Sequence, residues 1–302
     1  MAQKFYQQDR LNAEALTAKI LGGKGIKSFD RLGGLTNRSY RTELSDGRVV
    51  VVRIPGEGTE SIINREEECR STLLGCACGV DTVLHYFGSD GVKIMDFIPG
   101  AETMTAARLR EPEIIKKVAA IFRKLHASGV DTKVPFKVFD MAKKYKDFID
   151  EKGVTLYADF MEIRDKVEKI KGVVDASCDV RVVPCHCDSL CENWVLDADG
   201  RLYLIDWEYS GMNDAMWDLA DVSIEAAYGR AEDELLLKEY FCRDYTKLEF
   251  ENFTANKIYL DFLWTLWGKT RVPYDGEFME AYAKERYERL KENIAVFERI
   301  HK

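Results

Sequence analysis

Apolar and polar residues alternate in short runs along the first third of the chain, and turn-forming glycines separate these runs. Residues 29–32, 39–44 and 49–54 have the alternation or the β-branched enrichment that is typical of strands. Asp46-Gly47 fits a tight turn between the second and third of them. The third contains four consecutive valines, which predicts a strand buried on both faces.

Apolar residues have helical spacing both before these strands and after them. A short helix is predicted over residues 12–21, with Asn12 as its N-cap, and another over residues 60–74. Residues 83–87 and 92–95 form the predicted hairpin, with Asp90-Gly91 at its turn. The first third is therefore a small antiparallel β lobe of five strands with one main helix.

After Asp96 the pattern becomes mostly helical, so we place the boundary between two lobes there, at residues 1–96 and 97–302. Pro112 suits the first turn of a helix. Helices are predicted around residues 112–125, 145–149 and 157–170, strands at 180–183, 195–196 and 202–205, and only helices and loops from Trp217 onward. The predicted fold class is α+β, with the chemistry on loops where the lobes join.

Composition narrows the range of functions. The chain has 302 residues, 46% of them hydrophobic and 32% charged, which is typical of a globular protein. The formal net charge of −8 argues against a nucleic-acid partner, which usually meets a basic face. No apolar run approaches the ~20 residues that span a bilayer, and the first residues lack the apolar region of a secretion signal. We therefore expect a cytoplasmic protein without membrane insertion.

Eight cysteines raise the question of a metal site. Cys185, Cys187 and Cys191 form one cluster, and Cys76 and Cys78 form another. Neither has the paired CxxC spacing of structural zinc sites. In a reducing compartment we expect free thiols instead.

Two segments carry the chemistry, at residues 186–193 (HCDSLCEN) and 205–208 (IDWE). Phosphoryl transfer needs a base, a metal clamp and good positioning. Asp188 is the candidate base for a substrate hydroxyl. Asn193 and Asp206 offer the oxygen ligands that Mg²⁺ prefers, and are the candidate metal ligands on the phosphates of ATP.

These segments also carry a resemblance to a known family. Residues 33–40 (GGLTNRSY), 52–56 (VRIPG) and the pair 186–193 with 205–218 stand in the order found in bacterial choline kinases. That family is similar to aminoglycoside phosphotransferases and to other protein-kinase-like enzymes. The resemblance implies a two-lobed protein-kinase-like fold, ATP and Mg²⁺ as cofactors, and a small amino alcohol as substrate.

The resemblance also implies a set of nucleotide-binding residues. Arg53 stands where protein kinases have a phosphate-binding lysine, and Glu68 is its expected partner, although Glu66 and Glu67 are open alternatives. The full implied set for the nucleotide is Gly33, Gly34, Thr36, Asn37, Arg53, Glu68, Asp96 and Ile98. Glycines and free backbone N–H groups at residues 33–34 would approach the phosphates closely.

The acceptor site is predicted from aromatic residues. Trp264 and Trp267 lie three apart, on one side of a helix, and either fill the core or face a ligand. A quaternary ammonium cannot donate hydrogen bonds and is held by aromatic faces and nearby carboxylates. The family has a similar tryptophan pair in its choline cage, which favours the second interpretation. It also implies Glu225, Tyr228 and Tyr282 as further substrate-binding residues.

The sequence therefore predicts ATP-dependent phosphorylation of the choline hydroxyl. Ethanolamine, thiamine or an aminoglycoside would use the same chemistry on another acceptor. A rival from a different class is a pseudokinase that binds nucleotide without catalysis, but such a protein would be expected to have lost Asp188, Asn193 or Asp206. The oligomeric state is left open.

Overall fold

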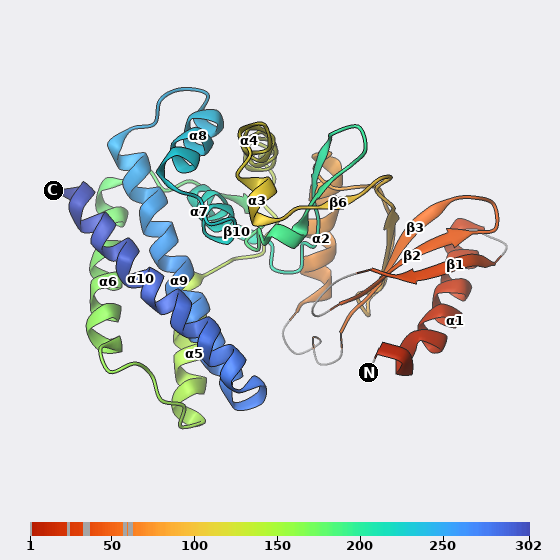
Figure 1. Ribbon diagram of the computed structural model, residues 1–302, viewed down its shortest axis with the longest axis horizontal. Coiled ribbons are helices and arrows are strands. Elements are labelled where there is room, and N and C mark those ends of the chain that lie inside the picture. The colour runs from red at the N-terminus through yellow and green to blue at the C-terminus, as the bar shows by residue number, and fades with distance from the viewer. Residues whose placement is uncertain (1, 23–24, 33–36, 57–58, 60–62) are drawn as a thin grey trace. The chain divides into compact units, whose positions relative to one another are not determined.

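The computed structural model describes residues 2–22, 25–32, 37–56, 59 and 63–302 (Figure 1). They form two compact units. The first comprises Met1–Thr105 with Cys191–Ser210, and the second comprises Ala106–Leu190 with Gly211–Lys302. The functional boundary between residues 96 and 97 stays a prediction. The α+β fold class is confirmed, with a small antiparallel sheet in the first unit and mostly helices in the second.

The first unit is built on an antiparallel sheet. Among the described residues its strands follow the order β1-β2-β3-β5-β4. Their bounds are β1 (Ile26–Arg31), β2 (Arg38–Leu44), β3 (Val49–Ile54), β4 (Leu84–Phe87) and β5 (Lys93–Asp96). The predicted five strands are thus confirmed. Val50 and Val52 are buried but Val49 and Val51 are partly exposed, so burial of β3 on both faces was a wrong prediction.

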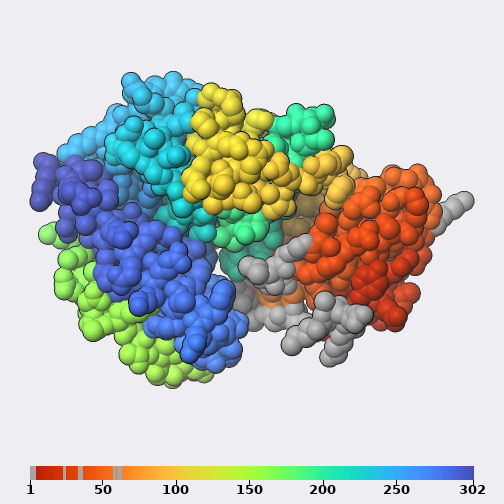
Figure 2. Space-filling view, viewed as in Figure 1, coloured from red at the N-terminus to blue at the C-terminus, as the bar shows by residue number. Residues whose placement is uncertain are grey.

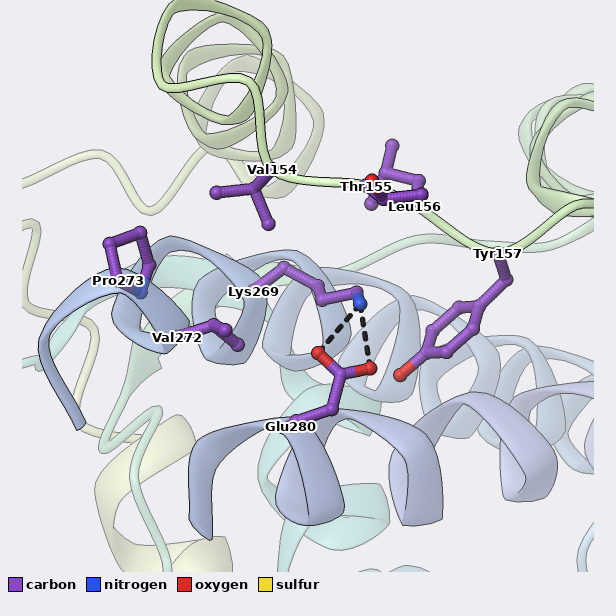
Figure 3. Close-up of a pocket in the computed structure, with 8 residues that line it drawn as sticks. All are labelled: Val154, Thr155, Leu156, Tyr157, Lys269, Val272, Pro273 and Glu280. Atoms are coloured by element: carbon purple, nitrogen blue, oxygen red, sulfur yellow. Dashed lines mark hydrogen bonds and ion pairs between the residues drawn. The ribbon is translucent and has the colours of Figure 1, made fainter. Parts of the chain in front are cut away.

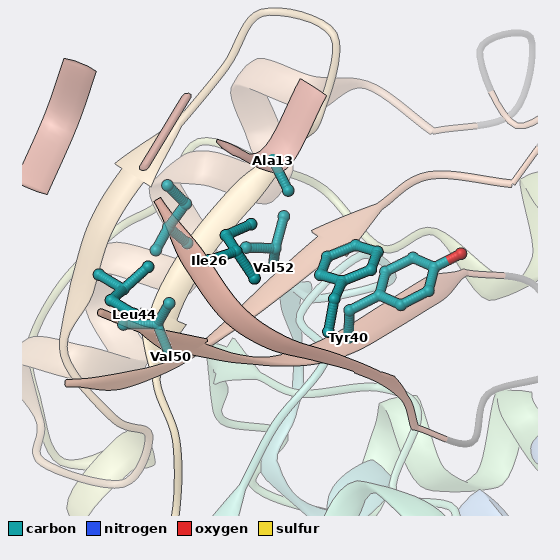
Figure 4. Close-up of a cluster of buried hydrophobic side chains, with 8 residues drawn as sticks. Ala13, Ile26, Tyr40, Leu44, Val50 and Val52 are labelled. Atoms are coloured by element: carbon teal, nitrogen blue, oxygen red, sulfur yellow. The ribbon is translucent and has the colours of Figure 1, made fainter. Parts of the chain in front are cut away.

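One face of this sheet packs against α1 (Ala2–Leu21). Figure 4 shows Ala13 of α1 lying with Ile26, Tyr40, Leu44, Val50 and Val52, all of them buried. The helix was predicted to begin at Asn12, which instead lies in its interior and accepts a hydrogen bond from Gln8.

Tertiary contacts explain the longer helix. Asp9 is almost fully buried, and its carboxylate accepts hydrogen bonds from Arg38 Nε and from the Tyr40 hydroxyl, both at 2.8 Å. Burial and this carboxylate raise the pKa of Tyr40 to about 12. Because these partners come from β2, the first turns of α1 are fixed by the sheet rather than by local propensity.

A second, three-stranded sheet of β6 (Glu102–Thr103), β8 (Trp194–Leu196) and β9 (Leu202–Leu204) belongs to the same unit. The segment after β9 lies against α2 (Arg65–Ala77), which Asn64 caps. Trp207 is fully buried there, and its Nε1 donates to Asp81 at 2.9 Å. Its indole occupies the space beside Gly75, so a glycine is needed at that point of α2.

The second unit is helical, apart from a two-stranded ladder of β7 (Val182–Cys185) and β10 (Gly211–Asp214). Its helices are α3 (Ala106–Leu109), α4 (Pro112–His126), α5 (Val138–Glu151), α6 (Phe160–Ser177), α7 (Ala215–Glu225), α8 (Arg230–Phe241), α9 (Lys247–Asp275) and α10 (Glu277–His301). Pro112 begins α4 as predicted. The predicted strand at 180–183 lies two residues further on, and β10 was not predicted because it is short and depends on its partner.

Helix α9 is the centre of this unit. It is buried along most of its length and contacts α5, α6, α7 and α10. Its surface and that of α10 adjoin the surface of α5 and α6 (Figure 2). None of the described helices is both long and apolar enough to cross a bilayer.

The close approach at Gly75 makes a prediction about stability. A Cβ there would lie 2.5 Å from Trp207 Cε2, so Gly75→Ala should force the indole or the helix to move. We expect a loss of about 1–3 kcal/mol in the free energy of unfolding, measured by urea denaturation. Gly172→Ala is the matched control, because Gly172 is exposed in α6 and a Cβ there meets nothing within 4 Å. It should gain about 0.5–1 kcal/mol from helix propensity; equal effects at both sites would contradict the packing argument.

Candidate active site

The loop that carries Asp188 follows β7 and is held by α7. The backbone N–H groups of His186 and Cys187 each donate to one Asp218 oxygen at 2.8 Å. The N–H of Ser189 donates to Asp221, one turn along the same helix. Cys187 has a φ of 66°, a backbone conformation that non-glycine residues rarely adopt. Side chains of α7 therefore fix the backbone on both sides of Asp188.

Asp218 is itself fully buried and has a second partner. His126 Nε2 lies 3.0 Å from Asp218 Oδ2, and His126 Nδ1 lies 2.9 Å from the Tyr240 hydroxyl. His126 was not predicted as a site residue, since a lone histidine at the end of a helix gives no signal. It connects α4 and α8 to the loop through Asp218.

Asp188 lies half-buried among acidic neighbours. Burial raises the pKa of Asp221 well above its usual range, and the charges of Glu225 and Asp188 raise it further. Burial likewise raises the pKa of Tyr282; Arg286 lowers it, while Glu225 and Asp188 raise it. The candidate base Asp188 and the predicted substrate residue Glu225 thus both lie within electrostatic reach of Tyr282 and of Asp221.

In the first unit, Arg53 lies at the centre of a buried ion cluster. Its Nη1 donates to Glu68 Oε1 and its Nη2 to Glu208 Oε2, both at 2.5 Å. The contact to Glu68 decides which of the three successive glutamates meets Arg53. Burial lowers the pKa of Arg53, but Asp206, Glu68 and Glu208 together outweigh it and hold the pKa above its usual value. The guanidinium therefore stays charged.

Asp206 and Asn193 come together at the edge of this cluster. The N–H of Ile205 donates to the Asn193 carbonyl at 2.9 Å, so the two predicted metal ligands lie just before β8 and just after β9, at the same end of this strand pair. Asp206 has a φ of 69° and is the most solvent-exposed of the cluster's carboxylates, at 31% of its side chain. Asn37 Nδ2 donates to Glu208 Oε2 at 3.1 Å and lies 3.4 Å from Asp206 Oδ2.

Three carboxylates of the cluster are close enough to one another to share a divalent cation, although Glu68 and Glu208 already accept from arginine side chains. Glu68, Asp206 and Glu208 each offer a carboxylate oxygen, and these atoms lie within 4.8 Å of one another. Hard oxygen ligands of this kind suit Mg²⁺. Burial and the neighbouring Asp206 raise the pKa of Glu208, as expected where negative charge is crowded. Glu208 was not predicted as a site residue, although it stands two residues from Asp206.

Two further cations complete the cluster. Arg65 Nη1 donates to Glu68 Oε2 at 2.7 Å. Lys93 is 4% exposed on β5, directly across the ladder from Arg53, and its Nζ lies 3.5 Å from Glu68 Oε1 and 4.0 Å from Asp206 Oδ1. Its ammonium has ion-pair neighbours but no hydrogen bond within the described residues. Lys93 was missed because its position depends on strand pairing, which no local motif reports.

The remaining predicted nucleotide residues divide into two groups. Gly33, Gly34 and Thr36 lie outside the described residues. Asp96 ends β5, with its carboxylate 2.6 Å from His85 Nε2, and Ile98 is buried two residues further on. Their roles stay predictions.

Three of the predicted acceptor residues lie on α9 and α10. The rings of Trp264 and Trp267 meet edge to face with centroids 5.9 Å apart, and Trp267 meets Tyr282 in the same way at 5.7 Å. Gly268 permits this approach, since a Cβ there would lie 2.9 Å from the Tyr282 ring. Trp264 is 8% exposed, whereas Trp267 and Tyr282 are half-buried and so are the more accessible rings.

Glu225 and Tyr228 stand at the end of α7. The Glu225 carboxylate accepts a hydrogen bond from Arg286 Nη2 at 2.6 Å. Tyr228 is buried, and its hydroxyl donates to the Leu109 carbonyl at 2.8 Å. That bond anchors Tyr228 to the end of α3; its part in substrate binding stays a prediction.

A pocket of about 530 Å³ lies beside this region, between the α5–α6 connection and α9 (Figure 3). Lys269 crosses it and donates to both oxygens of Glu280, at 2.7 and 2.8 Å. The ammonium also lies 4.5 Å from the centre of the Tyr157 ring. The ion pair joins α9 to α10 next to Gly268, and so braces the two helices where the aromatic rings meet.

The family model for choline/ethanolamine kinase matches residues 30–290. The chain belongs to the choline/ethanolamine kinase family. The predicted family is therefore confirmed, and with it the prediction of a small-molecule kinase.

Solved structures agree. A choline/ethanolamine kinase family protein from Mesorhizobium loti is 32% identical, with a TM-score of 0.84 over 97% of each chain. Choline kinase LicA from Streptococcus pneumoniae is 29% identical, with a TM-score of 0.78 over 95% of this chain and 99% of LicA. A structure of LicA in complex with AMP is 28% identical, with a TM-score of 0.76 over 95% of this chain and 98% of that one.

The buried ammonium of Lys93 leads to a prediction about nucleotide binding. We expect Lys93→Met to weaken Mg-ATP binding about tenfold, the loss of one charge-assisted contact of about 1.5 kcal/mol. Isothermal titration calorimetry measures this without turnover. Lys27→Met is the matched control, because Lys27 is an exposed lysine of the same sheet, paired with Glu43. Unchanged affinity in a folded Lys93→Met protein would remove Lys93 from the nucleotide site.

Proposed function

We propose that this protein transfers the γ-phosphoryl group of ATP to the hydroxyl of choline, giving phosphocholine. The observation that carries the proposal is the arrangement in the second unit. There the charges of the candidate base Asp188 and of Glu225 both act on Tyr282, and Tyr282 joins Trp264 and Trp267 in one aromatic wall. Such a wall suits a quaternary ammonium, and the base beside it suits the hydroxyl two carbons away.

Each residue has a distinct part in the reaction. Asp188 orients the choline hydroxyl, accepts its proton and so allows the oxygen to attack the γ-phosphorus in line with the departing ADP oxygen. Arg53 and Lys93 offset the negative charge of the phosphates. Asn193 and Asp206 would hold Mg²⁺, with Glu208 beside them; the ion supplies charge neutralisation on the phosphates. Positioning and fixed charge then account for most of the rate.

Related kinases support this choice of substrates. LicA from Streptococcus pneumoniae is a choline kinase, and a LicA structure contains AMP. Among the open alternatives, ethanolamine has specific support in the choline/ethanolamine family match. A primary ammonium is held best by several hydrogen-bond acceptors, however, and of the three clustered rings only Tyr282 carries one, its hydroxyl oxygen. We therefore place choline first, and we place the enzyme in the cytoplasm, where ATP is available.

The direct test is a panel of hydroxyl acceptors, incubated with the protein and Mg-ATP and scored by ADP release. Choline should give the highest kcat/KM among choline, ethanolamine, thiamine and an aminoglycoside. Trp267→Leu should raise the KM for choline more than about tenfold, through the loss of a cation–π contact of about 2 kcal/mol, and leave the KM for ATP nearly unchanged. Phe278→Leu is the control, since Phe278 is an exposed aromatic on α10. No turnover of any amino alcohol by the wild-type protein would refute the proposal.

A second prediction concerns the base. Asp188→Asn removes the proton acceptor while keeping the shape of the side chain, so kcat should fall by about 10²–10⁴-fold. Binding of Mg-ATP, measured by calorimetry, should persist. Asp131→Asn makes the same chemical change at an exposed loop and should leave kcat unchanged. Asp188→Asn with wild-type kcat would assign the base elsewhere.

A further inference from the structure

Three carboxylates of α7 lie between the loop that carries Asp188 and the aromatic wall described above. Asp218, Asp221 and Glu225 are spaced by three and four residues, so they share one face of the helix. Each has its own partner: Asp218 takes two backbone N–H groups of the loop, Asp221 takes the N–H of Ser189, and Glu225 takes the side chain of Arg286. Glu225 is paired with an arginine from another helix, and it was predicted to meet the substrate.

Arg286 is held in place from several sides. It is 7% exposed on α10, and its Nη2 donates to Glu225 Oε1 at 2.6 Å. Its Nη1 lies 3.8 Å from Asp261 Oδ1, and its guanidinium lies over the Tyr282 ring, 4.6 Å from the centroid. Burial lowers its pKa, but Glu225, Tyr282 and Asp261 more than compensate, so it stays charged. The arginine therefore contacts two predicted substrate residues at once.

This pairing changes what the Glu225 carboxylate can offer. An isolated carboxylate in an aromatic pocket attracts any ammonium, and it accepts hydrogen bonds from a primary one. With Arg286 bound, its charge is offset and one of its oxygens already has a strong donor. A primary ammonium brings three N–H donors, and each donor left without an acceptor after desolvation is costly. A quaternary ammonium has no N–H donors, so it loses no hydrogen bond when the carboxylate is already paired.

We propose that Arg286 determines acceptor choice: by pairing with Glu225 it disfavours primary ammonium groups and so selects quaternary ones. The inference rests on the proposed function and goes beyond it, because the rings alone accept either cation. Arg286 acts through Glu225 and Tyr282 rather than on the reacting atoms, so it is a positioning residue. Its effect should therefore be seen in the ratio of kcat/KM for choline to kcat/KM for ethanolamine.

The test is Arg286→Met, assayed with both amino alcohols. Removal of the arginine donor from Glu225 should raise kcat/KM for ethanolamine relative to choline, so that the ratio falls at least about tenfold, the size of one charge-assisted hydrogen bond. The change should lie mainly in KM. Arg286→Lys retains the cation and should restore most of the wild-type ratio, which a merely structural role for the arginine would not explain.

Arg289→Met is the matched control. Arg289 lies one turn along α10 and pairs with Asp261, at 2.6 Å, rather than with Glu225. Its removal disturbs the same helix and the same ion network, yet should leave the ratio within about twofold of the wild type. A second control is Arg286→Met combined with Glu225→Leu. This protein has neither the carboxylate nor another acceptor at residue 225, so its ratio should return toward that of the wild type.

The outcomes separate the two proposals. An unchanged ratio in folded Arg286→Met, with the wild type active on choline, overturns the role of Arg286 and leaves the proposed function standing. A wild type inactive on both amino alcohols overturns both. Because each ratio is measured within one protein, partial unfolding does not affect it. If Arg286→Met does not fold, Arg286→Gln keeps a donor without the charge, and the same direction of change is required of it.

Discussion

The hydrogen bonds from the loop backbone to Asp218 are the interaction on which the catalytic face of the second unit depends. Asp218 is fully buried, and a buried carboxylate is tolerated only with strong partners. It accepts two backbone N–H groups and contacts His126. Hydrogen bonds to a charged group contribute about 1.5–3 kcal/mol each, so the two together contribute about 3–6 kcal/mol, which exceeds the roughly 1–3 kcal/mol expected for the left-handed backbone at Cys187. The loop can therefore hold Asp188 in a conformation that an isolated peptide would leave.

The same constraint governs the first unit, where Arg53 takes the place of the backbone groups. Its two terminal nitrogens reach Glu68 and Glu208, on a helix and on a loop that are far apart in sequence. Asp206 follows the same pattern as Cys187, with a positive φ at a residue other than glycine. Trp207 then inserts beside Gly75 and prevents the loop from relaxing. In each unit, a residue with a positive φ is held in place by a buried charged side chain: Asp218 holds Cys187, and Arg53 holds the segment of Asp206.

Much of this arrangement follows from local sequence, and the rest follows from pairing that local sequence does not report. Strand periodicity predicts the five-stranded sheet, and motif spacing predicts Asp188, Asn193 and Asp206 as a group. Lys93 is different: it looks like an ordinary strand-end lysine until β3 and β5 pair and place it beside Arg53. The early start of α1 depends in the same way on Asp9 meeting β2. Cross-strand and helix–sheet partners are long-range properties, so no short motif contains them.

The pairing of Arg286 is another long-range property that no short motif contains. Its chemistry explains why aromatic residues alone are a poor guide to acceptor choice. Trp264, Trp267 and Tyr282 attract a cation by its charge and by the ring quadrupole, which treat primary and quaternary ammonium groups alike. Discrimination requires a difference in hydrogen bonding, because that is where the two cations differ. A site can make that difference either by adding acceptors for the primary ammonium or by occupying those already present. The Glu225–Arg286 pair is the second kind of device, because the arginine occupies a carboxylate oxygen that would otherwise accept from a primary ammonium.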